Sequence, residues 1–416
     1  MTQTEPTSAR FDPFEPGYVQ SPHAQYERLR RLDPVHWSDL LEGWVITRYD
    51  DVNAVLRDPA VSVELDNATS TPMVEAQLAQ RDESGRASGT LVLRDDPNHT
   101  RLRRLMQQPF GPRAIEGLRD MISRRVDGAL DLAVPRGHMD VIVDFAYPLP
   151  VAVFCEMLGI PAEDSPRFRI WTAAVARSLD PLVGPDEREA CMALLDDMQD
   201  YLEDQIGQKR AQPADDIMSA LVQATDAGDR LSTEELLAQL VTLYVAGHEP
   251  TTSLIGNGLL HLLEEPDQLE RLAVEPDLIT NAVMELLRFD GPNQFVRRIS
   301  VAPMVLSGRE VPAGSVLYLC VASANRDAER FGPDADRVRV DRPEASQHLQ
   351  FGAGIHNCLG NHLARLQAEI ALGALIARLD DIALAGEPQW SERMVLRGLQ
   401  NLPITFRPAE DPDARP

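Results

Sequence analysis

Apolar residues recur every three or four positions along most of the chain, which is the spacing of helices that bury one face. The pattern is nearly continuous between residues 96 and 233. Elsewhere it predicts separate helices, over residues 22–32, 50–58, 277–289 and 361–379.

Shorter stretches have the character of strands rather than helices. Residues 35–49 and 296–325 are rich in β-branched and aromatic residues between turn-forming positions, and the C-terminal end is similar. Residues 60–95 are polar and irregular, so we expect a long functional loop or disorder there. Together the patterns predict a mainly α fold with small β sheets.

One helix should be exceptionally long. It opens with a capping box, Ser232 to Glu235, and runs to about Glu264, just before Pro266. At 1.5 Å per residue this gives about 48 Å, so the helix should cross the whole molecule and be buried in its middle. A proline inside a helix costs about 3 kcal/mol or more, so Pro250 in its interior indicates a functional constraint.

Composition narrows the setting of the protein. The chain has 416 residues and a formal net charge of −25, which argues against nucleic acid and anionic membrane surfaces as partners. No Gly/Ser linker or repeat marks a boundary, so a single domain over residues 1–416 is expected, with flexible ends at 1–15 and 409–416. The sequence has no signal-peptide pattern and no run of about 18 apolar residues, which predicts a cytoplasmic location.

The four cysteines form no CxxC pair, and three of them lie in apolar or amphipathic stretches typical of a core: Cys155, Cys191 and Cys320. Cys358 differs, because it follows two glycines and directly precedes a helix. Orphan N–H groups and the helix dipole favour a thiolate at such a point, and a thiolate is a good axial ligand for haem iron. The alternative for so short a loop is a tight turn with a buried cysteine.

The full run from Phe351 to Ala364, FGxGxHxCxGxxLA, resembles the haem-binding signature of the cytochromes P450. An ordered series of motifs extends this resemblance over roughly residues 15 to 408. It implies a triangular, mostly α fold in which haem b lies between the long central helix and the cysteine loop. Cys358 would be the iron ligand, on a loop that begins with Phe351 and Gly352.

Other matches fit the same family. His99 and Arg103 lie one helical turn apart and alone would suggest a solvated basic helix. By resemblance they bind haem propionates together with Arg298 and His356, and a guanidinium fork suits a carboxylate.

Glu285 and Arg288 match the ExxR motif of the family. At i and i+3 the two side chains share a helix face, which alone would suggest an ordinary surface ion pair. The resemblance implies a buried structural pair, completed by Arg342.

The stretch around Pro250 matches the oxygen-activation motif, with one departure. Small Ala246 and Gly247 would leave room for a ligand over the iron, and Glu249 is the expected acid. The family then expects a threonine for proton delivery, where this chain has Pro250. Three explanations stay open. Thr251 takes over proton delivery, a group held by the substrate supplies the proton, or the enzyme couples radicals and needs less of the oxygen-insertion machinery. The ordinary alternative for Thr251 is a bond to a carbonyl one turn back.

Family resemblance also suggests the substrate pocket and the redox partner. Asn293, Gln294 and Gln400 could hydrogen-bond a polar substrate. The predicted pocket residues are Leu91, Val92, Leu243, Asn293, Phe295, Val296 and Gln400. Electrons from NAD(P)H would arrive through a ferredoxin reductase and a ferredoxin, docking near Arg101, Arg104 and Arg365.

Three functions remain open from the sequence. The first is a monooxygenase that hydroxylates or epoxidises a small-molecule secondary metabolite. The second is oxidative C–C or C–N coupling of aromatic or diketopiperazine substrates without oxygen insertion. The third is a non-catalytic haem-binding scaffold.

Overall fold

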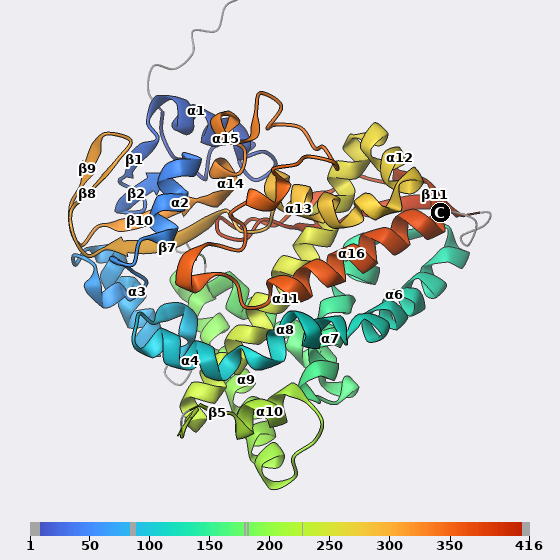
Figure 1. The fold of residues 1–416 in the computed structure, drawn as a ribbon, viewed down its shortest axis with the longest axis horizontal. Coiled ribbons are helices and arrows are strands. Elements are labelled where there is room, and N and C mark those ends of the chain that lie inside the picture. The colour runs from blue at the N-terminus through green and yellow to red at the C-terminus, as the bar shows by residue number, and fades with distance from the viewer. Residues whose placement is uncertain (1–8, 84–88, 179, 181–182, 227, 410–416) are drawn as a thin grey trace, which may run out of the picture.

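This computed structural model describes residues 9–409 except 84–88, 179, 181–182 and 227. Figure 1 shows the main sheet at the upper left, with helices filling the centre and the lower part. The helices are α1 His23–Leu32, α2 Tyr49–Arg57, α3 Pro72–Glu83, α4 Asn98–Met106, α5 Pro112–Glu116, α6 Arg119–Ala133, α7 Pro148–Leu158, α8 Ser165–Ser178, α9 Pro185–Ala211, α10 Ile217–Gln223, α11 Thr233–Glu264, α12 Pro266–Val274, α13 Ile279–Asp290, α14 Val321–Ala324, α15 Ala328–Phe331 and α16 Asn361–Arg378.

The strands form one five-stranded sheet in the order β1-β2-β10-β7-β3 and several smaller ones, including β11-β14-β4. In the large sheet only β2 and β10 run parallel. The strands are β1 Val35–Ser38, β2 Gly43–Ile46, β3 Val61–Ser62, β4 His138–Asp140, β5 Thr225–Asp226, β6 Asp229–Arg230, β7 Phe295–Ser300, β8 Met304–Leu306, β9 Arg309–Val311, β10 Val316–Cys320, β11 Leu379–Leu384, β12 Gln389–Trp390, β13 Leu399–Asn401 and β14 Pro403–Pro408. The mainly α class with small sheets is confirmed.

The central helix α11 begins as predicted. The Ser232 side chain accepts from the Glu235 backbone, and the Glu235 side chain accepts from the Ser232 backbone. The helix continues through Pro250 to Glu264, and most of its residues are buried. It packs against α7, α8, α9, α13 and α16, so it is the common partner of the surrounding helices.

The expectation of a flexible segment at residues 1–15 is wrong for its described part. Phe11 is 2% exposed and packs edge-on against Tyr18 and Phe295, at ring-centroid distances of 6.2 and 5.4 Å. Burial of an aromatic ring holds this segment to the sheet. At the other end, the Ala409 N–H donates to the Arg378 carbonyl. The rest of the predicted flexible ends, 1–8 and 410–416, lies outside the described residues.

The irregular segment predicted for residues 60–95 is also largely ordered in its described part. Carboxylates bind its backbone: Asp95 of the same segment accepts from Val63 N at 2.9 Å, and Glu42, which precedes the segment, accepts from Met73 N at 2.8 Å. Polar composition here signals side-chain capping of short elements. These elements are β3, Leu65–Asn67, α3 and Leu91–Leu93.

One 18-residue stretch among the described residues, Val141–Leu158, is long and apolar enough by length and composition to cross a membrane. Its mean hydropathy is 1.7, and 67% of it is buried inside the protein. It comprises a π-helical turn, Val141–Ala146, and α7, and both pack against α11. Contacts of this kind are those of a core helix.

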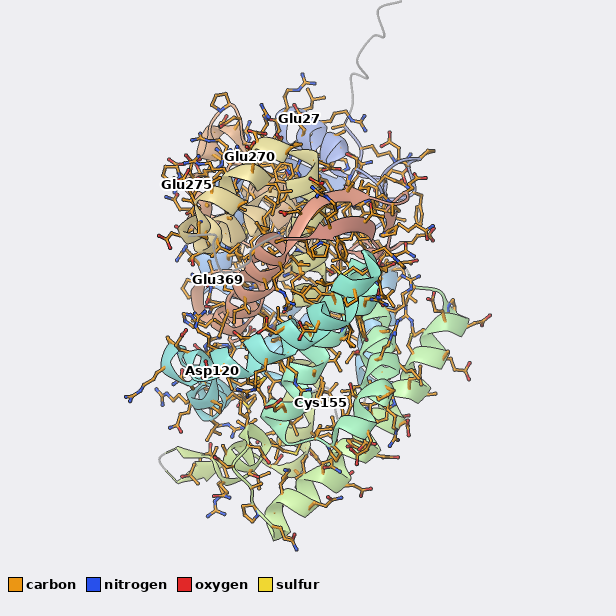
Figure 2. All side chains as sticks on the ribbon, turned by 90° about the vertical axis from the view of Figure 1, so that its right-hand side faces the viewer. Glu27, Asp120, Cys155, Glu270, Glu275 and Glu369 are labelled. Carbon is orange, nitrogen blue, oxygen red and sulfur yellow. The ribbon has the colours of Figure 1, made fainter. Side chains whose placement is uncertain are left out.

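Figure 2, a view from the side, labels several acidic residues. Glu27, Glu270 and Glu275 lie in the upper part and Asp120 in the lower part, and all four are exposed, so water solvates their charges. Cys155 lies inside the helical region and is 3% exposed, as the sequence predicted for a core cysteine.

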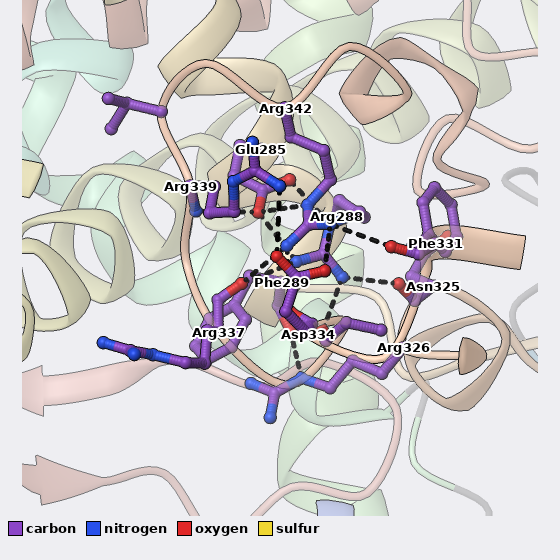
Figure 3. Close-up of polar contacts among 12 residues, drawn as sticks. Glu285, Arg288, Phe289, Asn325, Arg326, Phe331, Asp334, Arg337, Arg339 and Arg342 are labelled. Atoms are coloured by element: carbon purple, nitrogen blue, oxygen red, sulfur yellow. Dashed lines mark hydrogen bonds and ion pairs between the residues drawn. The ribbon is translucent and has the colours of Figure 1, made fainter.

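Glu285 on α13 binds two guanidinium groups inside the protein (Figure 3). Arg288 forms a fork on the carboxylate at 2.6 and 2.8 Å, and Arg342 donates to the same carboxylate at 2.9 Å. All three side chains are at most 1% exposed.

The remaining donors of the two arginines bind backbone oxygens. Arg288 donates to the carbonyls of Asn325, Ala335 and Arg337. Arg342 donates to Phe331, Asp334 and Arg337 carbonyls and to the Asp334 carboxylate. The network therefore ties α13 to residues 325–342, which lead into the cysteine loop.

We expect Glu285→Gln to destabilise the protein strongly. It keeps the side-chain shape but leaves the buried Arg288 without its counter-charge and Arg342 with the Asp334 carboxylate alone, and breaking a buried pair costs about 3–5 kcal/mol. The urea midpoint of unfolding should fall accordingly.

The matched control is Glu116→Gln. Glu116 pairs with Arg119 at the same i, i+3 spacing, but the side chains are 60% and 46% exposed. This change should leave the urea midpoint where it is, because exposed pairs contribute little. Equal midpoints for the two variants would contradict a structural role for the Glu285 network.

Candidate active site

The loop from Phe351 to Gly360 presents Cys358 immediately before α16. Gly352 and Gly354 have φ values of 67° and 70°, which side chains rarely adopt. A Cβ on Gly354 would also lie 2.6 Å from the Leu56 carbonyl oxygen. Glycine at this position is therefore required twice, by conformation and by contact.

Hydrogen bonds fix the backbone of Cys358 on both sides. Its N–H donates to the Phe351 carbonyl at 2.8 Å, and its own carbonyl accepts from the Asn361 amide at 2.7 Å. The Asn357 amide adds bonds to the Phe351 and Gly352 carbonyls at 3.2 and 3.3 Å. The sulfur position is thus set by the loop itself.

The environment of the thiol corrects one expectation. Burial raises the pKa of the Cys358 thiol, and this outweighs the lowering by a bond from the Gly360 backbone and by the charge of Arg103. The start of α16 alone does not make a thiolate. A coordinated metal removes the proton outright, so the loop suits a metal-bound sulfur rather than a free thiolate.

A cluster of cationic and imidazole donors lies beside this loop. The His99 and His356 rings are 4.2 Å apart between centroids. Burial, followed by the charges of His99, Arg298 and Arg103, lowers the pKa of His356 to about 3. Burial is also the main cause that lowers the pKa of Arg298 to about 10. Groups from α4, β7 and the cysteine loop therefore lie close enough for the positive charge of one to disfavour protonation of another.

The imidazoles of this cluster have buried ring nitrogens without hydrogen-bond partners among the described residues. His99 is 1% exposed, yet neither of its ring nitrogens has a hydrogen-bond partner. The nearest carboxylate oxygen of Asp96 is 3.8 Å from His99 Nδ1, too far for a hydrogen bond. His356 Nδ1 is also buried and unpartnered. Buried donors of this kind fit a bound anion, and the carboxylates of a haem edge satisfy them.

Ala246 faces open space on α11. It is exposed, although its neighbours Tyr244 and Val245 are buried, and Leu243 is half-buried. The expectation that Gly247 also leaves room over the iron is wrong. A Cβ on Gly247 would lie 2.0 Å from Phe154 Cζ, so this glycine admits the ring of Phe154 from α7 instead.

Both threonines after Pro250 use their hydroxyls on carbonyls. Thr251 Oγ1 donates to the Gly247 carbonyl at 2.9 Å and is 2% exposed. Thr252 Oγ1 donates to the Ala146 carbonyl at 3.2 Å. The Thr251 bond is the ordinary helical pattern of threonine, whereas the Thr252 bond joins α11 to the turn Val141–Ala146. A relay role for Thr251 stays a prediction.

Glu249 has a partner that sequence reasoning missed. Its carboxylate accepts from Arg393 Nη1 at 2.8 Å, across 144 residues of chain. The pair borders a cavity of about 250 Å³ between α11, α8, the turn Val141–Ala146 and residues 391–400. No motif marks Arg393, because the contact arises only from packing of the C-terminal segment on α11.

His248 lies on a buried side of α11, away from the exposed Ala246. Its ring packs edge-on against Tyr147 at 4.5 Å between centroids. Burial lowers the pKa of His248 to about 4, so the ring is neutral at physiological pH.

The predicted pocket residues meet different outcomes. Phe295 is wrong, because it is 5% exposed and packs against Phe11 and Tyr26 at 5.4 and 5.8 Å. Asn293 uses its amide nitrogen on the Gln350 carbonyl at 3.2 Å, which leaves it less free for a substrate. Gln400 lines the cavity beside Glu249.

The remaining pocket residues are only partly placed by the structure. Gln294 is 2% exposed and donates its amide to the Gly291 carbonyl. Leu91 is 6% exposed and belongs to the main core, whereas Val92 is 47% exposed. Val296 is half-buried. Their roles in a pocket stay predictions.

Arg101, one of the three arginines predicted for docking, pairs with two carboxylates. Arg101 pairs with Asp229 at 3.1 Å and also with Glu235. Its charge is neutralised locally, which weakens its part in steering a partner. Arg365 contacts Glu369 only at 3.8 Å, and Arg104 is exposed.

The α-rich fold, a cysteine loop before a helix and unpartnered donors beside it define a haem-thiolate protein. The Cytochrome P450 family matches over residues 163–389. The chain is 40% identical to Cytochrome P450 monooxygenase PikC of Streptomyces venezuelae, over 94% of this chain and 92% of that protein. The chain belongs to the cytochrome P450 family and is an oxidoreductase, and the family implies a haem-thiolate cofactor.

Two solved structures resemble the chain over nearly its whole length. Epothilone D-bound cytochrome P450epoK superposes with a TM-score of 0.89 at 31% identity, covering 97% of this chain and all of that one. CxnD, described as an enzyme for C–S bond formation in chuangxinmycin biosynthesis, gives 0.86 at 32%, covering 98% and 100%. Both support the P450 fold.

We expect His99→Ala to accelerate haem loss. A hydrogen bond to a charged group contributes roughly 1.5–3 kcal/mol, which corresponds to a rate about 10- to 100-fold higher. The measurement is haem transfer to excess apomyoglobin, followed at the Soret band.

His248→Ala is the matched control. His248 is equally buried and its ring nitrogens are equally unpartnered, but it packs against Tyr147. Its loss should change the transfer rate less than about twofold. Equal acceleration by both variants would contradict propionate binding by His99.

Proposed function

We propose that this P450 takes electrons from a ferredoxin and its NAD(P)H-dependent reductase and hydroxylates or epoxidises a small secondary metabolite in the cytoplasm. The observation that carries the haem assignment is the set of buried, unpartnered donors beside the Cys358 loop. When bound, haem supplies dioxygen binding and reductive O–O cleavage, favoured by a thiolate ligand. One domain over residues 1–416 performs this function in the proposal.

His99, Arg103, Arg298 and His356 hold the two propionates, and Cys358 supplies the sulfur ligand. Phe351 and Gly352 begin the loop that carries it. Glu285, Arg288 and Arg342 keep the preceding segment in place. Ala246 and Leu243 form the face of α11 toward the substrate.

Glu249 carries protons from the cavity side in this proposal. The carboxylate borders the 250 Å³ cavity, where Arg393 fixes its orientation. Pro250 offers no hydroxyl, and the hydroxyls of Thr251 and Thr252 donate to carbonyls. Glu249 is therefore the acidic group of this stretch that can exchange protons with water in the cavity.

An acidic ferredoxin is the proposed electron donor. Arg104 and Arg365 come from α4 and α16, the two helices that carry or follow haem-binding residues. Positive charges there would steer an acidic partner despite the net charge of −25. Arg101 contributes less, because of its carboxylate partners.

Oxidative coupling without oxygen insertion is the second candidate. Pro250, in place of the usual threonine, favours it, since coupling abstracts hydrogen from the substrate and inserts no oxygen. The similarity to CxnD, an enzyme for C–S bond formation, points the same way. A non-catalytic scaffold is disfavoured by the intact Cys358 loop and Glu249.

Turnover with labelled dioxygen tests the proposal. A ligand panel of macrolactones, diketopiperazines and flat aromatics is first screened for a low-to-high-spin shift at the Soret band. The ligand that shifts it is then incubated with ferredoxin, ferredoxin reductase, NADPH and ¹⁸O₂. We expect one ¹⁸O atom in the product by mass spectrometry. A cross-linked product without ¹⁸O would establish the second candidate, and no turnover of any ligand that shifts the spectrum would contradict both.

Two variants on α11 test which side chain delivers the proton. Pro250→Thr restores a hydroxyl one turn after Ala246, and we expect more product per NADPH consumed, because the missing donor is supplied. Thr251→Val should lower this ratio only if Thr251 serves the relay. An unchanged ratio and product pattern in Pro250→Thr would show that the proline is neutral for proton delivery.

A further inference from the structure

A buried glutamine on α11 forms two hydrogen bonds with the backbone of the segment before α4. Gln239 is 1% exposed, and its Oε1 accepts from Leu91 N at 3.0 Å. Its Nε2 donates to the Gly89 carbonyl at 3.2 Å. One side-chain amide thus satisfies a donor and an acceptor of the same segment, as a neighbouring strand would.

Thr242 adds a second attachment one turn later. Its hydroxyl donates to the Ala238 carbonyl at 2.9 Å and lies 2.7 Å from the hydroxyl of Thr90. A hydroxyl has one hydrogen, so Thr242 divides it between the Ala238 carbonyl and the Thr90 hydroxyl. Thr90 is 4% exposed, which makes this an interior contact.

The segment Gly89–Val92, which these bonds hold, lies over the face of α11 that carries Ala246. Seven residues at 100° each bring Gln239 to within about 20° of Ala246 around the helix. Thr242 precedes Ala246 by four residues, on the same face. A Cβ on Gly89 would lie 3.9 Å from Ala238 Cβ, so the segment lies flat against the helix.

The far end of the segment is held independently. Asp95 N donates to the Glu64 carboxylate at 3.1 Å, and the Asp95 carboxylate accepts from Val63 N at 2.9 Å. The turn Leu91–Leu93 lies between these two attachments, with Leu91 buried and Val92 47% exposed. The position of the Val92 side chain therefore depends on both ends.

We propose that Gln239 and Thr242 are positioning residues that hold Gly89–Val92 against α11 and thereby set the width of the ligand pocket next to Ala246. This inference rests on the proposed haem site and goes beyond it, because it assigns pocket shape to two residues of α11. The amide is specific: leucine could make neither bond, and glutamate could only accept from Leu91 N. The substrates admitted are those whose bulk fits beside a fixed Val92.

Amide hydrogen exchange of the holoenzyme tests, without turnover, whether Gln239 and Thr242 hold Gly89–Val92. We expect the peptide covering residues 89–95 to exchange at least about tenfold faster in Gln239→Leu, since Leu91 N loses its acceptor. Gln239→Glu keeps that acceptor and should fall between Gln239→Leu and wild type. Thr242→Val, a smaller change, should also accelerate exchange there, which keeps the test available if Gln239→Leu does not fold.

Gln199→Leu is the matched control. Gln199 is also 1% exposed, but neither atom of its amide has a hydrogen-bond partner. The same substitution there should leave exchange of residues 89–95 unchanged. Equal acceleration by Gln199→Leu, or none by Gln239→Leu and Thr242→Val, would overturn the proposal.

Imidazole binding to the haem measures the effect on the pocket. Stopped-flow association should be several-fold faster in Gln239→Leu and Thr242→Val than in wild type and Gln199→Leu. Unchanged association together with faster exchange would overturn the link to pocket width. Absence of a haem Soret band in the wild-type protein would refute the proposed function instead. The exchange comparison would still decide whether Gln239 and Thr242 hold Gly89–Val92 against α11.

Discussion

The carboxylate of Glu285 is the interaction on which the arrangement of the site depends. It compensates two guanidiniums in an interior where an isolated charge would be very unfavourable. Their remaining donors hold carbonyls of residues 325–337, so one charge cluster orders a segment without regular structure of its own. This segment leads to the cysteine loop, which therefore starts from a fixed point.

The haem site shows the opposite balance of charge. His99 and His356 lie ring against ring near Arg103 and Arg298, and neither nitrogen of His99 nor Nδ1 of His356 has a hydrogen-bond partner among the described residues. The protein alone bears the repulsion and the desolvation of these groups, as the lowered pKa of His356 and Arg298 shows. A dianionic cofactor relieves both, so binding of the cofactor and stability of this region are coupled.

Helix α11 serves several purposes because its faces differ. One face carries Ala246 with Gln239 and Thr242, and a neighbouring side brings Glu249 to Arg393 and the cavity. Gly247 receives Phe154 on yet another side. Pro250 can be accommodated because the surrounding helices hold α11 along its length, and packing can offset a local penalty.

The sequence by itself determined the helical class, the bounds of α11 with its capping box and the cysteine loop, because these depend on local periodicity and on spacing within a few residues. It also indicated the Glu285–Arg288 pair, since i and i+3 share a helix face. It could not determine the ion pair between Glu249 and Arg393, the hydrogen bonds of Gln239 to Gly89 and Leu91, or the side of β7 on which the Phe295 ring packs. These contacts join residues far apart in the chain, and only the packing of whole elements decided them.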